Sequence, residues 1–112
     1  MKGKRTAIYC RVDRGGDPNH RQYALEMQRK KLERYAKAKG VQVSGFYVDD
    51  GFTGCDLERP GLTQLISDYH AGIFEQVLVI NRSRLYRGNR WDEPKWPFQV
   101  CSLNQLEHDQ IR

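Results

Sequence analysis

The pattern of apolar and polar positions divides the chain into alternating strand-like and helix-like stretches. Residues 5–12 (RTAIYCRV) mix apolar side chains with β-forming residues, and the glycine-rich residues 15–19 follow as a turn signal. Residues 21–39 contain no proline or glycine and end at Gly40, a residue typical of helix C-caps. Their apolar positions recur at helical spacing. These positions are Leu25, Leu32, Tyr35 and Ala36. The pattern predicts a strand, a loop and an amphipathic helix.

The same alternation is repeated further along the chain. Residues 41–48 (VQVSGFYV) return to a period of two, and residues 49–51 (DDG) close this second strand with a turn. A second helix opens at Pro60, which suits a first-turn position, and ends before Gly72. Residues 76–80 (QVLVI) then predict a short, fully buried strand.

Strands that alternate with helices predict an α/β fold with a mainly parallel sheet flanked by helices. Ligands of such folds gather at the carboxyl ends of the strands. Here those ends are residues 11–13, 49–51 and 81–87, which we expect to converge at one edge. Beyond Arg90 the pattern weakens, with residues 98–103 (FQVCSL) as a possible fourth strand and residues 104–112 unassigned.

Length and composition indicate one folded unit. The 112 residues suit a single domain, residues 1–112. No run approaches the roughly 20 apolar residues of a membrane-spanning helix, so we expect a cytoplasmic protein without a membrane partner. Three widely spaced cysteines fit neither a disulfide framework nor a zinc site, and we expect reduced thiols, two of them in strands.

The net charge of +5 is concentrated in three segments, residues 1–5, 29–39 and 82–90. Such clusters favour a polyanionic partner such as a nucleic acid. A solvated helix face explains the lysines of the second cluster equally well. The arginine run of the third is harder to explain in that way.

Three segments carry a family resemblance. Residues 9–12 (YCRV) match an opening Tyr-x-Arg-Val, and residues 49–62 hold Asp-Gly and Arg-Pro-Gly-Leu motifs. Residues 77–87 (VLVINRSRLYR) end in Arg-Leu-x-Arg. Together with Gln28 in the first helix, they resemble the N-terminal catalytic domain of the serine recombinases, the resolvase/invertase family. The resemblance covers about residues 5–90, and residues 91–112 are divergent or truncated.

The resemblance implies a resolvase-like catalytic domain for site-specific DNA recombination. In this family a serine attacks a DNA phosphodiester without a metal or cofactor, so arginines must meet the phosphoryl charge. The matching positions are Arg11, Arg59, Arg84 and Arg87. Arg84 and Arg87 are three residues apart and share a face if a helix follows residue 80. Arg82 and Arg90 have no such counterparts and are general phosphate contacts or plain surface. The predicted DNA-binding set is Arg82, Arg84, Arg87 and Arg90.

This chain departs from the family at the serine position, which is Asp13. A carboxylate repels phosphate, and its acyl phosphate adduct would hydrolyse, so we expect impaired catalysis. Asp13 could instead pair internally with the arginines. Ser83 stands where the family has an aspartate, and a nucleophilic Ser83 stays an alternative.

The C-terminal part also departs from the family. Only ten residues, 88–97, separate Arg87 from the possible fourth strand, so the family's helix there should be shortened or lost. The dimerisation helix and DNA-binding domain of family members are absent from this sequence, which is either a fragment or a stand-alone remnant. In a full-length context the resemblance implies a homo-oligomer.

Three classes of function stay open. The first is an impaired recombinase domain, and the second is a non-enzymatic DNA-associated or regulatory module. In the third, a metal-dependent nuclease-like domain, Asp13, Asp49 and Asp50 would cluster as ligands for Mg²⁺.

Overall fold

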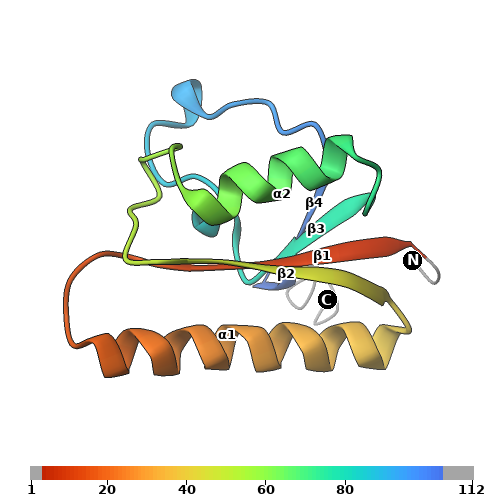
Figure 1. Cartoon of the computed structure of the whole chain (residues 1–112), viewed down its shortest axis with the longest axis horizontal. Coiled ribbons are helices and arrows are strands. Elements are labelled where there is room, and N and C mark those ends of the chain that lie inside the picture. The colour runs from red at the N-terminus through yellow and green to blue at the C-terminus, as the bar shows by residue number, and fades with distance from the viewer. Residues whose placement is uncertain (1–3, 105–112) are drawn as a thin grey trace.

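The computed structural model describes residues 4–104, apart from the side chain of Arg90. The α-helices and strands of this part are β1 (Arg5–Val12), α1 (Pro18–Lys39), β2 (Gln42–Asp50), α2 (Pro60–His70), β3 (Gln76–Val79) and β4 (Gln99–Ser102). The strands form one sheet in the order β2-β1-β3-β4, with every neighbouring pair parallel. Helix α1 covers one face of the sheet and α2 the other (Figure 1). The predicted α/β fold is confirmed.

Strand β1 lies inside the sheet and is buried from Thr6 to Val12. Ala7 and Tyr9 pack into the core on the α2 side, whereas Ile8 and Cys10 pack into the core on the α1 side. Both faces of a strand covered by helices must be apolar, which explains why residues 5–12 lack a clean alternation of polar and apolar positions.

Helix α1 begins at Pro18, three residues before the predicted start at residue 21. The side chain of Asp17 accepts a hydrogen bond from the backbone N–H of Asn19 (2.8 Å), and Pro18 fits the first turn because its missing N–H needs no partner there. Residues 17–19 are therefore a helix start rather than a loop. Gly40 ends the helix in the left-handed conformation, as predicted.

Strand β2 is longer than predicted, because Asp49 and Asp50 pair with Arg11 and Val12 of β1 instead of turning. The turn comes at Gly51, whose φ is 86° and whose N–H donates to the carbonyl of Val12 (3.0 Å). This places the carboxyl end of β2 directly beside that of β1.

Among the described residues, no α-helix lies between β3 and β4. A short 3₁₀ turn, η1 (Arg82–Arg84), replaces the helix considered after residue 80. The segment before β4 contains one further 3₁₀ turn, Arg90–Asp92, so the expected shortening is confirmed. The fourth strand is also confirmed, and β4 pairs with β3. Residues 105–112, for which the sequence predicts no element, lie outside the described residues.

The three cysteines are free thiols, and Cys10 and Cys101 lie in strands as expected. Burial raises the pKa of Cys10 to about 12, so this thiol stays protonated and acts as a core residue. Among residues 4–104, no helix is long and apolar enough to cross a membrane.

Candidate functional site

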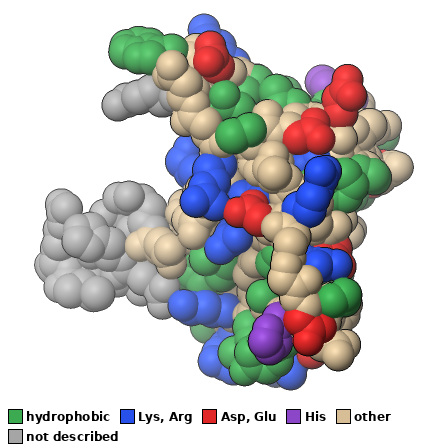
Figure 2. All heavy atoms as spheres, turned by 90° about the vertical axis from the view of Figure 1, so that its left-hand side faces the viewer, with side chains coloured by type: hydrophobic (Ala, Val, Ile, Leu, Met, Phe, Trp, Pro, Cys, Tyr) green, Lys and Arg blue, Asp and Glu red, His purple; other side chains and the backbone are tan. Residues whose placement is uncertain are grey.

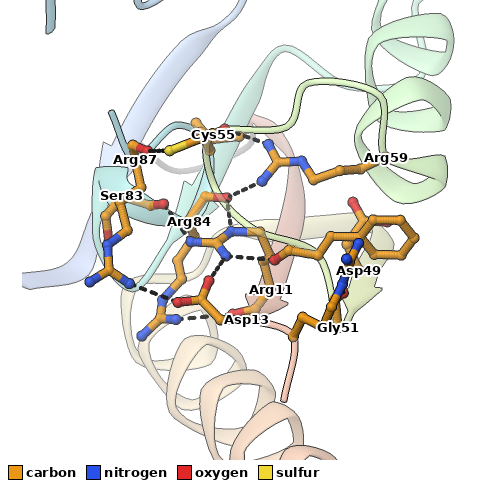
Figure 3. Close-up of polar contacts among 12 residues, drawn as sticks. Arg11, Asp13, Asp49, Gly51, Cys55, Arg59, Ser83, Arg84 and Arg87 are labelled. Carbon is orange, nitrogen blue, oxygen red and sulfur yellow. Dashed lines mark hydrogen bonds and ion pairs between the residues drawn. The ribbon is translucent and has the colours of Figure 1, made fainter. Parts of the chain in front are cut away.

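The carboxyl ends of β1, β2 and β3 meet at one edge, as the sequence predicts for a parallel sheet. Figure 2 looks onto this edge, where basic side chains gather with acidic ones among them. Figure 3 shows that Arg11, Asp13, Arg59, Arg84 and Arg87 all lie there. The predicted convergence of these five residues is present in the structure, but their environments differ sharply.

Arg11 is completely buried, and its guanidinium donates hydrogen bonds to four acceptors. Its Nε donates to the carbonyl of Arg84 (2.9 Å) and its Nη2 to that of Ser83 (2.8 Å). Its Nη1 donates to the carbonyl of Phe52 (2.8 Å) and to the carboxylate of Asp13. The guanidinium therefore joins the loop after β2 to the turn after β3.

Arg59, the residue before α2, is also completely buried. Its Nη1 donates to the carbonyl of Arg84 (3.2 Å), and its Nη2 donates to that of Leu85. The guanidinium lies 5.7 Å from the ring centre of Tyr9, and burial lowers its pKa. Arg59 thus supports the turn η1 from the side opposite to solvent.

Gly54 allows the loop after β2 to approach Arg11 and Arg87 closely. A Cβ at this position would lie 2.8 Å from Nη2 of Arg11 and 2.5 Å from Cβ of Arg87. The carbonyl of Gly54 accepts a hydrogen bond from the N–H of Arg87 (2.9 Å). The Sγ of Cys55 donates to the carbonyl of Arg87. A side chain at residue 54 would force these groups apart.

Asp13 lies between a buried and an exposed arginine. Its Oδ1 pairs with Nη1 of Arg11, and its Oδ2 pairs with Nη1 of Arg87 (2.7 Å). The hydrogen bond from Arg11 holds the pKa of the Asp13 carboxyl below its ordinary value, and the charges of Arg11, Arg87 and Arg84 act in the same direction. Asp13 is therefore an anion that occupies the space between these two guanidinium groups.

The α-helix that would place Arg84 and Arg87 on one face does not form. Nη1 of Arg84 turns back to donate to the carbonyl of Arg11 (3.0 Å), and burial lowers the pKa of Arg84. The side chain of Arg87 is 66% exposed. The 3₁₀ turn ends at Arg84, so the regular helical spacing on which the prediction relied is lost.

Ser83 exposes no activated hydroxyl. Its Oγ donates to the side-chain carbonyl of Asn81, and an amide oxygen is too weak a base to take the proton of a nucleophile. Its backbone carbonyl, in contrast, is a direct acceptor for Arg11.

The three carboxylates considered for a metal site have separate partners. Asp49 accepts hydrogen bonds from the N–H groups of Gly61 (2.7 Å) and Leu62 (2.9 Å), and Asp50 pairs with Arg21 (2.9 Å). Asp13 pairs with arginines. Within residues 4–104, no three His, Cys, Asp or Glu side chains gather in a way that could hold a metal ion.

Two cations of the predicted DNA-binding set face solvent. The side chain of Arg82 is 55% exposed and makes an ion pair with Glu93 (3.6 Å), and Arg87 is exposed beside Asp13. The side chain of Arg90 lies outside the described part of the structure.

A family comparison agrees with this architecture. Residues 6–91 match the model of the resolvase N-terminal domain, which is more than half of the chain. The chain belongs to this resolvase family. The matched region ends within the turn Arg90–Asp92, just before the segment that was expected to diverge.

Two solved structures and one relative extend this comparison. The N-terminal catalytic domain of TP901-1 integrase is 35% identical, with a TM-score of 0.75 over 91% of this chain and 79% of that one. The C-terminal catalytic domain of ISC1926 TnpA, an IS607-like serine recombinase, is 27% identical, with a TM-score of 0.72 over 96% and 78%. The uncharacterized immunity region protein 3 of Bacillus phage phi105 is 30% identical over 62% of this chain and 84% of its own length.

Two contacts in this resolvase-type domain were missed at the level of sequence. The side-chain amide of Gln28 bonds both backbone groups of Arg11, accepting from its N–H (3.3 Å) and donating to its carbonyl (3.0 Å). The hydroxyl of Tyr9 donates to Asp49 (2.7 Å), which caps α2. The family resemblance singles out Gln28 but does not identify its partner, and nothing in the sequence links Tyr9 to Asp49.

Proposed function

We propose that this chain is a resolvase-family domain that associates with DNA but does not form the covalent protein–DNA link of a recombinase. Asp13 stands at the position of the nucleophile. The observation that supports the proposal is the pair of contacts from Asp13 to Arg11 and Arg87, because a phosphate would have to compete with this carboxylate for Arg87.

The chemistry of a carboxylate supports this proposal. Asp13 is ionised near neutral pH and repels the phosphodiester, and an aspartyl phosphate would be open to water. Such an adduct could not retain the bond energy that strand rejoining requires. A nucleophilic Ser83 is disfavoured by its hydrogen bond to Asn81.

Within the predicted catalytic set, Arg11 and Arg59 are completely buried whereas Arg87 is exposed. We assign both a positioning role, because their donors go to backbone carbonyls of the turn that carries Arg84. Arg87 is the member of the set that remains accessible to a phosphate, once its contact to Asp13 is broken.

DNA association would be electrostatic and would depend on the exposed cations. Arg82 and Arg87 lie at the sheet edge on a chain of net charge +5, and we include Arg84 and Arg90 from the sequence prediction. Phosphate contacts of this kind weaken steeply as salt rises. In a full-length context we expect a homo-oligomer.

A second candidate is a non-enzymatic regulatory module. It is favoured by the similarity to a phage immunity region protein, which extends over 84% of that relative. In such a module the ion pairs of Asp13 with Arg11 and Arg87 would have a structural role. Asp13 would then not be a substitution that inactivates an enzyme.

The test is a denaturing gel of protein and labelled supercoiled DNA, with the unmodified chain, Asp13→Ser, Asp13→Asn and Ser83→Ala. The unmodified chain and Asp13→Asn should give no covalent band. A band that appears only in Asp13→Ser would indicate an impaired recombinase domain, and DNA binding without any band would favour the regulatory module. A covalent band from the unmodified chain would contradict the proposal, and its loss in Ser83→Ala would identify Ser83 as the nucleophile.

A further inference from the structure

A groove of about 620 Å³ lies between α1 and the end of β3. Its apolar lining comes from Tyr23, Ala24 and Met27 of α1 and from Ile80. Tyr23 is 63% exposed and Met27 is 48% exposed, although most apolar side chains of this domain are buried. The described residues therefore leave apolar surface exposed in this groove.

The basic residues around this groove are Lys30, Lys31, Arg34 and Arg84. Among the described residues that line it, none is Asp or Glu. Tyr23, Met27 and Arg34 follow one another at spacings of four and seven residues, so they form one stripe along α1. An apolar stripe beside cations, without carboxylates, is complementary to a segment with apolar side chains flanked by acidic ones.

We propose that this groove binds an acidic, amphipathic segment of a partner protein. A helix laid along α1 would insert its apolar face between Met27 and Ile80 and direct its carboxylates to Lys30, Lys31 and Arg34. Duplex DNA fits less well, because a phosphate backbone has no apolar side chains to cover Tyr23 and Met27.

The groove is also lined by two residues that hold Arg11 in position. Gln28 and Arg84 line the groove, and both hydrogen-bond the backbone carbonyl of Arg11. A partner in the groove would therefore touch the residues that hold Arg11 in place, without entering the space around Asp13.

The test is fluorescence anisotropy with the full chain and a labelled synthetic helix that has leucines along one face and glutamates beside them. A peptide of the same composition with scrambled order is the matched control. We expect the amphipathic peptide to bind more tightly than the scrambled one. Lys30→Glu/Lys31→Glu and Met27→Asp should each weaken binding about tenfold or more. Lys37→Glu, on α1 outside the groove, and Leu57→Asp, before α2, should leave it unchanged.

Three results would overturn the proposal. The first is equal binding of the two peptides, or equal weakening by Lys37→Glu and by the Lys30/Lys31 reversal. The second is that the groove variants leave peptide binding intact but abolish binding of labelled duplex DNA, which would assign the groove to DNA. The third is a concentration-dependent dimer in sedimentation that Met27→Asp dissolves, which would assign the groove to a second copy of this chain.

Discussion

Two pairs of arginines at the same edge of the sheet have opposite surroundings. Arg11 and Arg59 are completely buried, and most of their hydrogen bonds go to backbone carbonyls. Arg82 and Arg87 are more than half exposed, and each meets a carboxylate at the surface. A residue type suited to binding phosphate thus serves in one pair to hold the protein's own backbone and in the other pair to face solvent.

The contrast teaches that burial, rather than residue type, decides what an arginine at this edge does. A guanidinium has five N–H donors, and burial directs most of them to acceptors inside the protein, although the buried Nε of Arg59 has no hydrogen-bond partner in the described structure. Asp13 connects the two pairs, because one of its oxygens contacts buried Arg11 and the other contacts exposed Arg87.

The largest effect should come from removing a buried arginine. Arg59→Ala removes the side-chain donor to the carbonyl of Leu85 and one of the two donors to the carbonyl of Arg84, and it opens a cavity beside Tyr9. We therefore expect a decrease of about 4 kcal/mol in unfolding free energy. Urea unfolding measures it, with Arg82→Ala as the exposed control, which should lose no more than about 0.5 kcal/mol. Equal decreases in the two variants would remove the distinction between the pairs.

The second-largest effect on stability should come from the loop after β2, which packs against buried Arg11 and exposed Arg87. Gly54→Ala places a Cβ 2.8 Å from Nη2 of Arg11 and 2.5 Å from Cβ of Arg87, and we expect the unfolding free energy to fall by about 2 kcal/mol. The neighbouring exposed residue provides the control, Thr53→Ala, in the same unfolding experiment. A stable Gly54→Ala variant would mean that the loop can withdraw from the two arginines at little cost.

A smaller effect on stability is expected from the ion pairs of Asp13, and it should depend on pH. Because the folded pKa of Asp13 is lowered, its ion pairs stabilise the fold fully above the ordinary value of 3.8, and this contribution is lost as pH falls through the folded pKa. Asp13 is 42% exposed, so we expect only about 1 kcal/mol. Unfolding curves should show the unmodified chain more stable than Asp13→Asn near neutral pH, and the difference should shrink in acid. A difference that grows in acid would have the wrong sign.

The smallest effect on stability should come from Arg87→Ala, with a clearer effect on DNA binding. If Arg87 binds one phosphate, its removal should reduce the slope of log affinity against log salt by about 0.9. Binding to labelled duplex DNA at several salt concentrations measures this slope. The matched control is Lys37→Ala, on the far part of α1, and an equal change in both variants would argue against DNA binding at the sheet edge.

The sequence predicted the arrangement of this site better than its chemistry. Strand ends and the parallel sheet follow from hydrophobic patterning, so the convergence of Arg11, Asp13 and Arg59 could be expected. The donors of Arg11 and Arg59 could not be assigned, because they bond to carbonyls of residues 83–85, and backbone acceptors have no signature in the sequence. The condition on which Arg84 and Arg87 were expected to share a face is not met, because a 3₁₀ turn forms where the expectation required a helix.

The most direct test of the account is the pKa of the Asp13 carboxyl, measured by following its ¹³C chemical shift during an NMR titration. If Asp13 is an anion held between Arg11 and Arg87, its pKa should lie below the ordinary value of 3.8 and should move toward it in Arg87→Ala. A pKa at or above 3.8 in the unmodified chain, unchanged by Arg87→Ala, would contradict it.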